Sequence, residues 1–406
     1  MKKVVVIGGG ASGMFAALTS AKLNNEVILL EKNEKLGKKI YITGKGRCNL
    51  TNDVSAQDFF KNVVTNPKFL FSSIYSFTPT DLMNFFTNIG LNLTVERGNR
   101  VFPSSNKASD VTKFLEKELR KYDVDIKLNT EVFNVNVVEG VVKSVLTNNG
   151  EILCDSVIIA TGGISYPSTG STGDGYVFAK KTGHKIVEPK PSLVGLELSG
   201  SDFVPLQGLS LKNVSITTFV NNKEIYSDFG EMLFTHYGVS GPIILSSSCY
   251  LNKCNLNDAH LKIDLKPALD DATLDARLIR EFAENNNKFI GVAIRSLVPS
   301  TLVDTILSKA KLSKNKKCAE VTKEERKNLI YILKNLNFKV KSLRPVEEAV
   351  VTSGGVSVKD INPKTMESRL VKGIYFCGEV IDVDAFTGGF NLQIAFSTGY
   401  TAGNNA

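Results

Sequence analysis

Three glycines near the start of the chain have the spacing that binds nucleotide phosphates. Gly8, Gly10 and Gly13 form a G-x-G-x-x-G motif between the apolar run KVVVI and a stretch that favours a helix. The first glycine permits a tight turn, the second lets backbone approach a pyrophosphate, and the third lets helix and strand pack closely. The backbone amides at the start of the helix and the helix dipole then hold the phosphates. Glu31 ends the next apolar run, where a carboxylate can bind ribose hydroxyls, so the sequence predicts a dinucleotide site.

A second glycine-hinged loop, GKGRCNLTN at 44–52, concentrates groups that can hold a cofactor. We expect Arg47 to offset pyrophosphate charge through charge-assisted hydrogen bonds, and Asn49 and Thr51 to supply further polar contacts. Cys48 is expected to face the cofactor or substrate cavity. The alternative is a loop with a purely structural role.

Two distant segments indicate that the dinucleotide is FAD rather than NAD. VIIATGG at 157–163 is an apolar run ending in paired glycines, where backbone can lie against a second part of a cofactor. In 375–393, Asp382 can contact the ribityl or phosphate region, and the helix that begins near Gly389 can present amides to the flavin pyrimidine edge. FAD is long enough to need both ends of the chain, whereas the alternative is a generic strand–turn–helix connection. The expected cofactor contacts are Gly8, Gly10, Ala11, Ser12, Gly13, Glu31, Lys32, Arg47, Cys48, Asn49, Thr51, Val132, Thr161, Gly162, Gly378, Glu379, Asp382, Gly389, Phe390 and Asn391.

Motifs of other redox and metal proteins are missing from the chain. There is no second G-x-G-x-x-G and no C-x₄-C near the flavin, which argues against a disulfide reductase with two Rossmann domains. If NAD(P)H is the electron donor, we therefore expect it to bind transiently. The six cysteines and three histidines show no C-x-x-C pair and no zinc spacing, so we expect no metal site and no disulfide scaffold.

Hydrophobic periodicity places these motifs in an α/β framework. KVVVIGGG, ASGMFAALTSAKL and EVILLEK are typical of a β-α-β unit, and 109–122 of an amphipathic helix with Ser109 as its N-cap. The stretch 124–163 predicts a β-meander that ends in an apolar strand. ITTFVNNKEIYSDF predicts a hairpin around Asn221 and Asn222.

A change of pattern near Pro189–Pro191 indicates that the nucleotide-binding domain is interrupted. We predict a Rossmann-like FAD-binding domain of residues 1–190 plus 345–406. A β-rich domain, 191–265 with 335–344, and a basic helical domain, 266–334, are inserted into it.

The positive charge of the chain is concentrated in one segment. The net charge is +8, and 309–344 holds twelve Lys or Arg and three Glu, a net charge of +9. Such a segment can bind a polyanion, although lysines at helical spacing can equally form a solvated face. No apolar run reaches the roughly 18 residues of a membrane span, so we expect a cytoplasmic protein without membrane association.

Five motifs together resemble one family of bacterial NAD(P)/FAD-dependent oxidoreductases, which includes BaiN-like, RdsA-like and aminoacetone-oxidase-like proteins. The motifs are GKKIYITGKGRCNLTN, RVFPSS, IATGGISYPSTGSTGDGY, FTHYGVSGP and GEVIDVDAFTGGFNLQIAFSTG. The resemblance implies a cytoplasmic flavoprotein with an inserted β-barrel-like domain and a helical domain. RdsA-like members are dihydrouridine synthases of large-subunit ribosomal RNA, BaiN-like members are linked to steroid double-bond reduction, and aminoacetone oxidase is a third activity. Lys45 stands where many relatives carry Gly.

Reduction of a carbon–carbon double bond requires a hydride on one carbon and a proton on its neighbour. Four residues are our candidates for the substrate side of the site: His236, Cys48, Arg100 and Tyr166. His236 precedes a glycine-rich turn that can bring it over the flavin. The alternatives are a structural or exposed histidine and an inert, packed thiol.

We therefore expect an FAD-dependent enzyme that uses NAD(P)H to reduce uridine to dihydrouridine in large-subunit ribosomal RNA. The basic segment 309–344 supplies a reason for RNA, since phosphate neutralisation dominates affinity for nucleic acid. One alternative is a small-molecule flavoenzyme, either a steroid or enone reductase or an amine oxidase. Another is a non-catalytic, FAD-containing RNA-binding protein.

Overall fold

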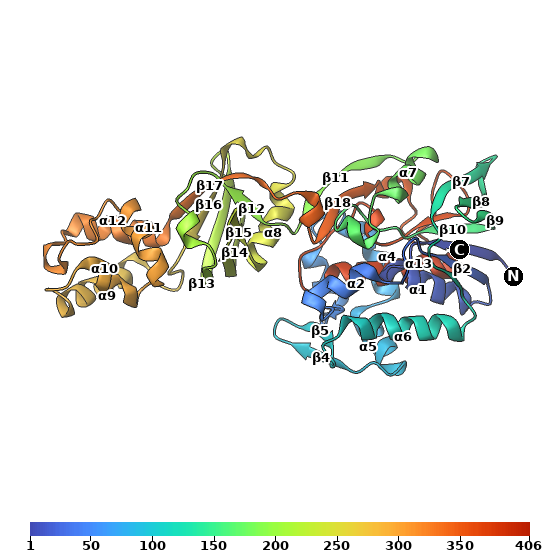
Figure 1. Cartoon of the computed structure of the whole chain (residues 1–406), viewed down its shortest axis with the longest axis horizontal. Helices are drawn as coiled ribbons and strands as arrows, with labels where there is room; N and C mark the ends of the chain where they lie inside the picture. The colour runs from blue at the N-terminus through green and yellow to red at the C-terminus, as the bar shows by residue number, and fades with distance from the viewer. The chain divides into compact units, whose positions relative to one another are not determined.

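The computed structural model describes all 406 residues, which form two compact units (Figure 1). Unit 1 comprises Met1–Ser192 and Pro345–Ala406, and unit 2 comprises Leu193–Arg344. Each unit encloses a hydrophobic core of its own. None of the helices combines the length and the apolar character needed to cross a lipid bilayer.

A five-stranded parallel sheet forms the centre of unit 1. Its central strand has the buried sequence KVVVI, as a strand covered on both faces should. All pairings are parallel, so the carboxyl ends of the strands lie at one edge, where ligands of such sheets bind. In spatial order the strands are β19 (Ile374–Phe376), β10 (Ser156–Ile159), β1 (Lys3–Ile7), β2 (Glu26–Leu30) and β6 (Asp125–Lys127).

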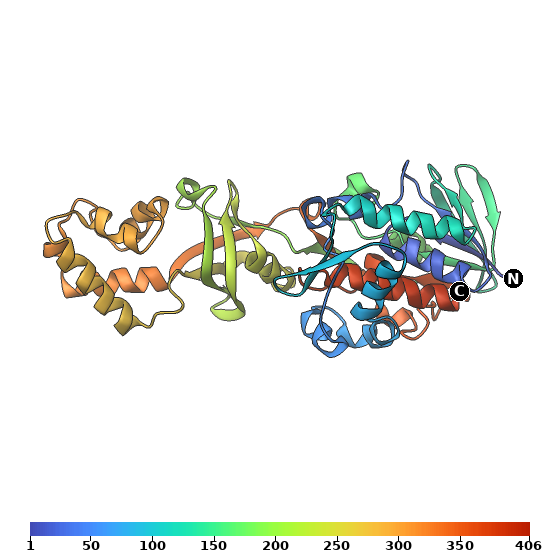
Figure 2. The same ribbon diagram turned by 90° about the horizontal axis from the view of Figure 1, so that it is seen from below.

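The first and last long helices of unit 1 pack against each other. Figure 2 shows α1 (Ala11–Ala21, blue) beside α13 (Phe390–Asn405, red). A Cβ on Gly399 would lie 2.4 Å from the Ser12 carbonyl oxygen, and one on Gly403 would lie 2.4 Å from the Ala16 carbonyl oxygen. Only glycine permits this approach of two backbones, which brings the two ends of the chain together.

Smaller elements surround the main sheet of unit 1. The meander predicted for 124–163 is present as β7 (Val132–Val138), β8 (Val141–Thr147) and β9 (Gly150–Leu153), although β6 at its start joins the main sheet. Ser109 is not the N-cap of α6 (Ala108–Lys121), because the helix begins one residue before Ser109 and Lys107 holds the extended cap conformation. The helices are α2 (Lys38–Ile42), α3 (Ala56–Phe59), α4 (Phe71–Ser76), α5 (Pro79–Asn88), α6 (Ala108–Lys121) and α7 (Asp174–Lys181). The strands are β3 (Thr51–Asn52), β4 (Leu93–Glu96), β5 (Arg100–Pro103), β7 (Val132–Val138), β8 (Val141–Thr147), β9 (Gly150–Leu153), β11 (Ile186–Ser192) and β18 (Val351–Val356).

Unit 2 is a closed six-stranded barrel with helices. The hairpin predicted around Asn221 and Asn222 is present, with φ of +50° and +60° at these residues, as a two-residue turn between twisted strands requires. A Rossmann-type fold with a barrel inserted into it confirms the predicted fold class. The strands are β12 (Leu196–Leu198), β13 (Ser210–Val220), β14 (Lys223–Phe234), β15 (Gly238–Ser240), β16 (Ala259–Asp264) and β17 (Leu336–Leu343). The helices are α8 (Pro242–Leu251), α9 (Asp271–Glu284), α10 (Ile290–Ala293), α11 (Ser300–Lys309) and α12 (Lys323–Lys334).

Candidate cofactor and substrate site

The glycine turn between β1 and α1 makes the close contacts that its spacing predicts. Gly8 has φ of +104°, and a Cβ there would lie 2.6 Å from the backbone that follows β10. A Cβ on Gly13 would lie 1.8 Å from the Gly8 carbonyl oxygen. A Cβ on Gly10 would meet nothing within 4 Å. The turn therefore leaves open space beside the first residues of α1, Ala11 and Ser12, where a phosphate group can approach.

The buried carboxylate of Glu31 lies at the end of β2, next to the glycine turn. Its Oε2 accepts a hydrogen bond of 2.8 Å from the Gly9 amide, and its Oε1 accepts one of 2.9 Å from the Asn33 amide. The Asn33 side-chain amide donates a second bond, of 2.6 Å, to Oε1. Each carboxylate oxygen can accept about two hydrogen bonds, so Oε2 retains capacity for a ribose hydroxyl. Lys32 instead forms an ion pair of 2.6 Å with Asp174, at the start of α7.

Arg47 is tied to neighbouring side chains in the glycine-hinged loop. Its guanidinium forms an ion pair with Glu96 and a hydrogen bond of 2.8 Å to Asn106. It also lies over the Phe102 ring, 4.2 Å from the ring centroid. The charge of Arg47 is thus already compensated by a carboxylate, and its predicted contact with pyrophosphate stays a prediction.

Cys48 lies in the same loop and is fully buried. Its backbone has φ of +60°, in the left-handed region. Burial raises the pKa of its thiol to about 12, so the group stays protonated and is a weak acid. The thiol offers no surface to substrate in this structure, so its role as proton donor stays a prediction that the burial does not favour.

The end of this loop is joined to the start of α13. The Thr51 hydroxyl donates a buried hydrogen bond of 2.6 Å to Gln393 Oε1. A Cβ on Gly389 would lie 2.3 Å from the Thr51 carbonyl oxygen. The Asn52 side-chain amide donates a hydrogen bond of 3.0 Å to the Gly388 carbonyl oxygen. Two predicted cofactor segments, far apart in the sequence, are therefore neighbours.

A polar network links Glu379 to α2, to β18 and to the loop that follows β10, and none of these links was predicted from the sequence. Its Oε2 pairs with Lys39 Nζ of α2 at 2.8 Å. Its Oε1 accepts bonds from the Ser165 hydroxyl, at 3.0 Å, and from the Thr352 amide, at 2.8 Å. Beside it, Gly378 has φ of +77° and donates its amide hydrogen to a side chain of α13. The only feature of the sequence that could have drawn attention to Lys39 is its place in the paired lysines of the GKK stretch.

Side chains before and at the start of α13 are held by internal bonds. The Asp382 carboxylate accepts a hydrogen bond of 3.0 Å from the Asn66 side-chain amide. The Asn391 side chain bonds both the amide and the carbonyl of Ala385, at 3.0 and 2.7 Å. Phe390 is buried. The first amides of α13 have no partner within the helix, so they remain able to bind a ligand.

Two buried oxygens close to these loops have no hydrogen-bond partner, namely Thr161 Oγ1 and Asn49 Oδ1. An unsatisfied buried polar group costs about 1–3 kcal/mol unless a ligand completes it. With the open space at Gly10, these two groups fit an extended nucleotide such as FAD. Gly162 follows Thr161 with φ of +73°, and Val132 is buried at the start of β7.

The structure places the substrate-side candidates on different elements. Tyr166 is half-buried with φ of +50°, and its amide bonds the Glu347 carbonyl oxygen at 3.2 Å. Arg100 is exposed on β5 and donates to the Arg97 carbonyl oxygen at 3.1 Å. His236 is exposed in unit 2, between β14 and β15. Their roles in catalysis stay predictions.

Seven of the twelve cations of the basic segment 309–344 form ion pairs within unit 2. Lys316 pairs with Glu325 at 2.6 Å, whereas Arg326 pairs at 2.5 Å with Asp275, which lies outside the segment. The charge on the surface is therefore smaller than the sequence indicates. The cations that form no ion pair are Lys311, Lys317, Lys323, Lys327 and Lys339.

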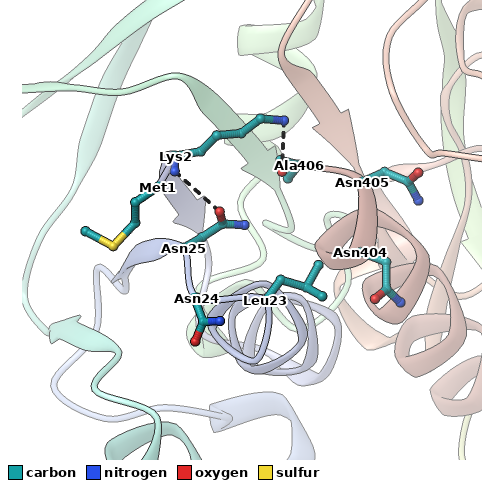
Figure 3. A pocket seen from close by; sticks show the side chains of 8 residues that line it. All are labelled: Met1, Lys2, Leu23, Asn24, Asn25, Asn404, Asn405 and Ala406. Atoms are coloured by element: carbon teal, nitrogen blue, oxygen red, sulfur yellow. Dashed lines mark hydrogen bonds between the residues drawn. The ribbon is translucent and has the colours of Figure 1, made fainter.

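A depression on unit 1 lies at the opposite end of the sheet from these loops. Figure 3 shows its lining, which includes Lys2, Asn25 and Asn405. These residues lie at the amino ends of β1 and β2 and at the last turn of α13, whereas cofactors bind at the carboxyl end of such sheets. We therefore do not assign this depression to the cofactor. No group of three or more His, Cys, Asp or Glu side chains has the arrangement of a metal site.

Comparison with known proteins gives full-length similarity to two curated enzymes. The chain is 31% identical to the ribosomal RNA dihydrouridine synthase of Haemophilus influenzae, covering 98% of this chain and 96% of the relative. It is 30% identical to the 3-dehydro-bile acid delta(4,6)-reductase of Clostridium scindens, covering 100% of this chain and 99% of the relative.

A solved structure shares the fold at lower sequence identity. The 3-ketosteroid-delta4-(5alpha)-dehydrogenase of Rhodococcus jostii superposes with a TM-score of 0.55 and 13% identity, covering 100% of this chain and 96% of that chain. The family model described as HI0933-like protein Rossmann domain matches residues 2–405. The chain therefore belongs to the HI0933-like family of Rossmann-fold, FAD-dependent oxidoreductases.

Proposed function

We propose that this protein reduces uridine to dihydrouridine in large-subunit ribosomal RNA in the cytoplasm, with NAD(P)H as a transient electron donor. The observation that carries the proposal is the 31% identity, over nearly the whole of both chains, with a ribosomal RNA dihydrouridine synthase. A sequence pI of about 9.0 and several cations without acidic partners are consistent with a polyanionic substrate.

The residues of unit 1 can bind and orient the cofactor. When bound and reduced, FAD supplies the hydride for the double bond. The turn at Gly10 and the start of α1 would hold its pyrophosphate, and Glu31 would bind a ribose. The unbonded amides at the start of α13 would stabilise negative charge at the pyrimidine edge of the flavin. Thr161 and Asn49 would complete their hydrogen bonding against the cofactor.

A second candidate is a small-molecule enone reductase. The specific observation in its favour is the 30% identity with a bile acid reductase, again over the full length of both chains. One relative is named a reductase, and the other is named a synthase of dihydrouridine, the product of reducing the 5,6 double bond of uridine. The two candidates therefore differ in substrate rather than in reaction class.

The two candidates can be separated in one assay with purified, FAD-loaded protein. NADH or NADPH is added with ribosomal RNA from a strain that lacks this protein, or with a 3-oxo-4,6-diene bile acid. We expect mass spectrometry to detect dihydrouridine at one site of the large-subunit RNA and no reduction of the steroid. Reduction of the steroid alone would reject the RNA assignment.

A further inference from the structure

Three exposed cations of unit 1 form what we call the cationic rim: Lys45, Arg97 and Arg100. None of the three takes part in any of the ion pairs of the chain. They come from the glycine-hinged loop and from the β4–β5 hairpin. A group of uncompensated positive charges on one surface attracts polyanions over a distance of about a Debye length.

The loop and the hairpin are held together by Arg47. Its ion pair with Glu96 reaches from the loop to the residue before Arg97. Both Arg47 and Arg100 lie over the Phe102 ring, at 4.2 and 5.9 Å from the ring centroid. Glu96, the nearest acid of the hairpin, is thus used by Arg47, which leaves the charges of the rim free.

Lys45 occupies a backbone conformation that is unfavourable for lysine. Its φ is +58°, between Gly44 at +57° and Gly46 at +84°. A non-glycine residue in the left-handed region costs about 1–2 kcal/mol, and glycine would avoid this cost. The Lys45 side chain forms no hydrogen bond or ion pair within unit 1 to offset it, and it extends from the exposed tip of the loop. Its position is therefore better explained by a contact outside the chain.

The rim lies beside the start of α13. The Asn52 amide donates a bond of 3.0 Å to the Gly98 carbonyl oxygen at the tip of the hairpin. The same amide donates a bond of 3.0 Å to the Gly388 carbonyl oxygen. One side chain thus connects the hairpin that carries Arg97 and Arg100 to the loop where we place the flavin end of the cofactor.

We propose that the cationic rim binds backbone phosphates of the RNA on either side of the uridine that is reduced. The inference rests on the proposed function. A target base must leave its stack to reach a flavin, and phosphate contacts next to it would hold the unstacked strand. Arg97 and Arg100 can each bind a phosphate through two parallel hydrogen bonds, and Lys45 can bind one as a point charge. The role of Arg100 is then to hold substrate rather than to transfer a proton.

The test is a triple variant, Lys45→Asn, Arg97→Gln and Arg100→Gln, in the FAD-loaded full chain. Asparagine tolerates the left-handed region, so folding is preserved. The matched control removes three exposed lysines of unit 1 that lie on β8, on α7 and before β19: Lys143→Gln, Lys180→Gln and Lys372→Gln. Dihydrouridine formation on ribosomal RNA, RNA affinity against salt, and flavin reduction by NADH and NADPH are measured.

We expect kcat/KM for RNA to fall about 10- to 100-fold in the triple variant, mainly through KM. The slope of log affinity against log salt should become shallower by about 2, since each single-strand phosphate contact contributes about 0.7. Flavin reduction should be unchanged, and the control should resemble the parent protein. If the kinetics with RNA and the salt slope are both unchanged in the triple variant, the proposal that the cationic rim binds RNA is wrong.

Two other outcomes separate the rim from the proposed function. If the parent protein binds RNA but forms no dihydrouridine, the proposed function fails, and the salt slope alone decides whether the rim stands. If the triple variant slows flavin reduction by NADPH but not by NADH, the rim binds the 2′-phosphate of the donor and the RNA assignment is overturned.

Discussion

The glycine turn between β1 and α1 and the basic segment 309–344 carry the two strongest sequence signals, and the structure gives the two a different outcome. In the turn, a Cβ on Gly13 would lie 1.8 Å from the Gly8 carbonyl oxygen, and one on Gly8 would lie 2.6 Å from the Ala160 carbonyl oxygen. In the basic segment, most of the cations are paired with acids, several from distant parts of the sequence.

The difference follows from what each residue type demands of its surroundings. A glycine that meets another backbone is irreplaceable on its own, because no other residue lacks a side chain. A lysine can be solvated, can pair with a carboxylate or can bind a polyanion, and the sequence around it does not show which of these occurs. Glycine spacing therefore predicted local backbone geometry more securely than charge predicted an exposed cationic surface.

The largest expected effect comes from comparing Gly13→Ala with Gly10→Ala. The first places a Cβ 1.8 Å from the Gly8 carbonyl oxygen, so we expect a loss of about 3 kcal/mol or more in the free energy of unfolding. The second has free space, so stability should change by less than about 0.5 kcal/mol while FAD affinity falls, because the added methyl group blocks the phosphate. Denaturant unfolding and flavin absorbance measure the two quantities. Equal effects of the two variants would contradict this account of the turn.

A smaller effect is expected from breaking an ion pair in the basic segment. Arg326→Met leaves Asp275 of α9 without its partner, and the pair is mostly shielded from solvent. We expect the free energy of unfolding to fall by about 1 kcal/mol, with RNA affinity unchanged. Chemical unfolding and an RNA-binding titration provide the measurements, and Lys327→Met, at a neighbouring exposed position without an ion pair, is the control. A stability equal to that of the control would mean that the pair contributes nothing.

The same ion pairs predict a dependence of stability on pH. Hydrogen bonds from Arg326 lower the pKa of Asp275, and those from Lys316 lower the pKa of Glu325. A lowered pKa in the folded state contributes stability above the unfolded pKa of about 4, and this contribution is lost as pH falls through the folded value. Thermal melts between pH 7 and pH 3 should therefore show less loss for an Asp275→Asn, Glu325→Gln variant than for the parent. A parallel loss in both would reject the assignment.

The smallest effect is expected at the unpaired lysines of the segment. Replacing Lys317, Lys323 and Lys327 by Gln should make the salt slope of RNA binding shallower by less than about 1, with stability unchanged. Filter binding at several salt concentrations tests this, with Lys316→Gln as the control, because that residue pairs with Glu325. If the salt slope changes more in this variant than in the cationic rim variant, the basic segment 309–344 rather than the rim makes the main contact with RNA.

Elements whose residues act locally were predictable from the sequence. The β-α-β unit, its glycine turn and the Asn221–Asn222 hairpin depend on apolar periodicity and on backbone conformation over a few residues. Ser109 was wrong as a cap, because it lies two residues after the N-cap Lys107 and is therefore inside the helix.

Contacts between distant segments were not predictable. Nothing in the sequence indicates that Glu379 pairs with Lys39, or that Asn52 connects a hairpin tip to the loop before α13. Such contacts depend on how the main sheet brings the segments to one edge. Several of the residues in question are polar and have equivalent alternatives nearby, so a single sequence does not distinguish them.

The strand that precedes unit 2 and the strand that follows it are paired with each other. Ser192, the last residue of β11, lies opposite Val351 in an antiparallel ribbon of unit 1. The chain therefore departs from unit 1 and returns to it at almost the same point. A short peptide from Ser192 to Pro345 would therefore make unit 1 a continuous chain. With this geometry a gene can acquire or exchange an inserted domain without disturbing the fold of unit 1.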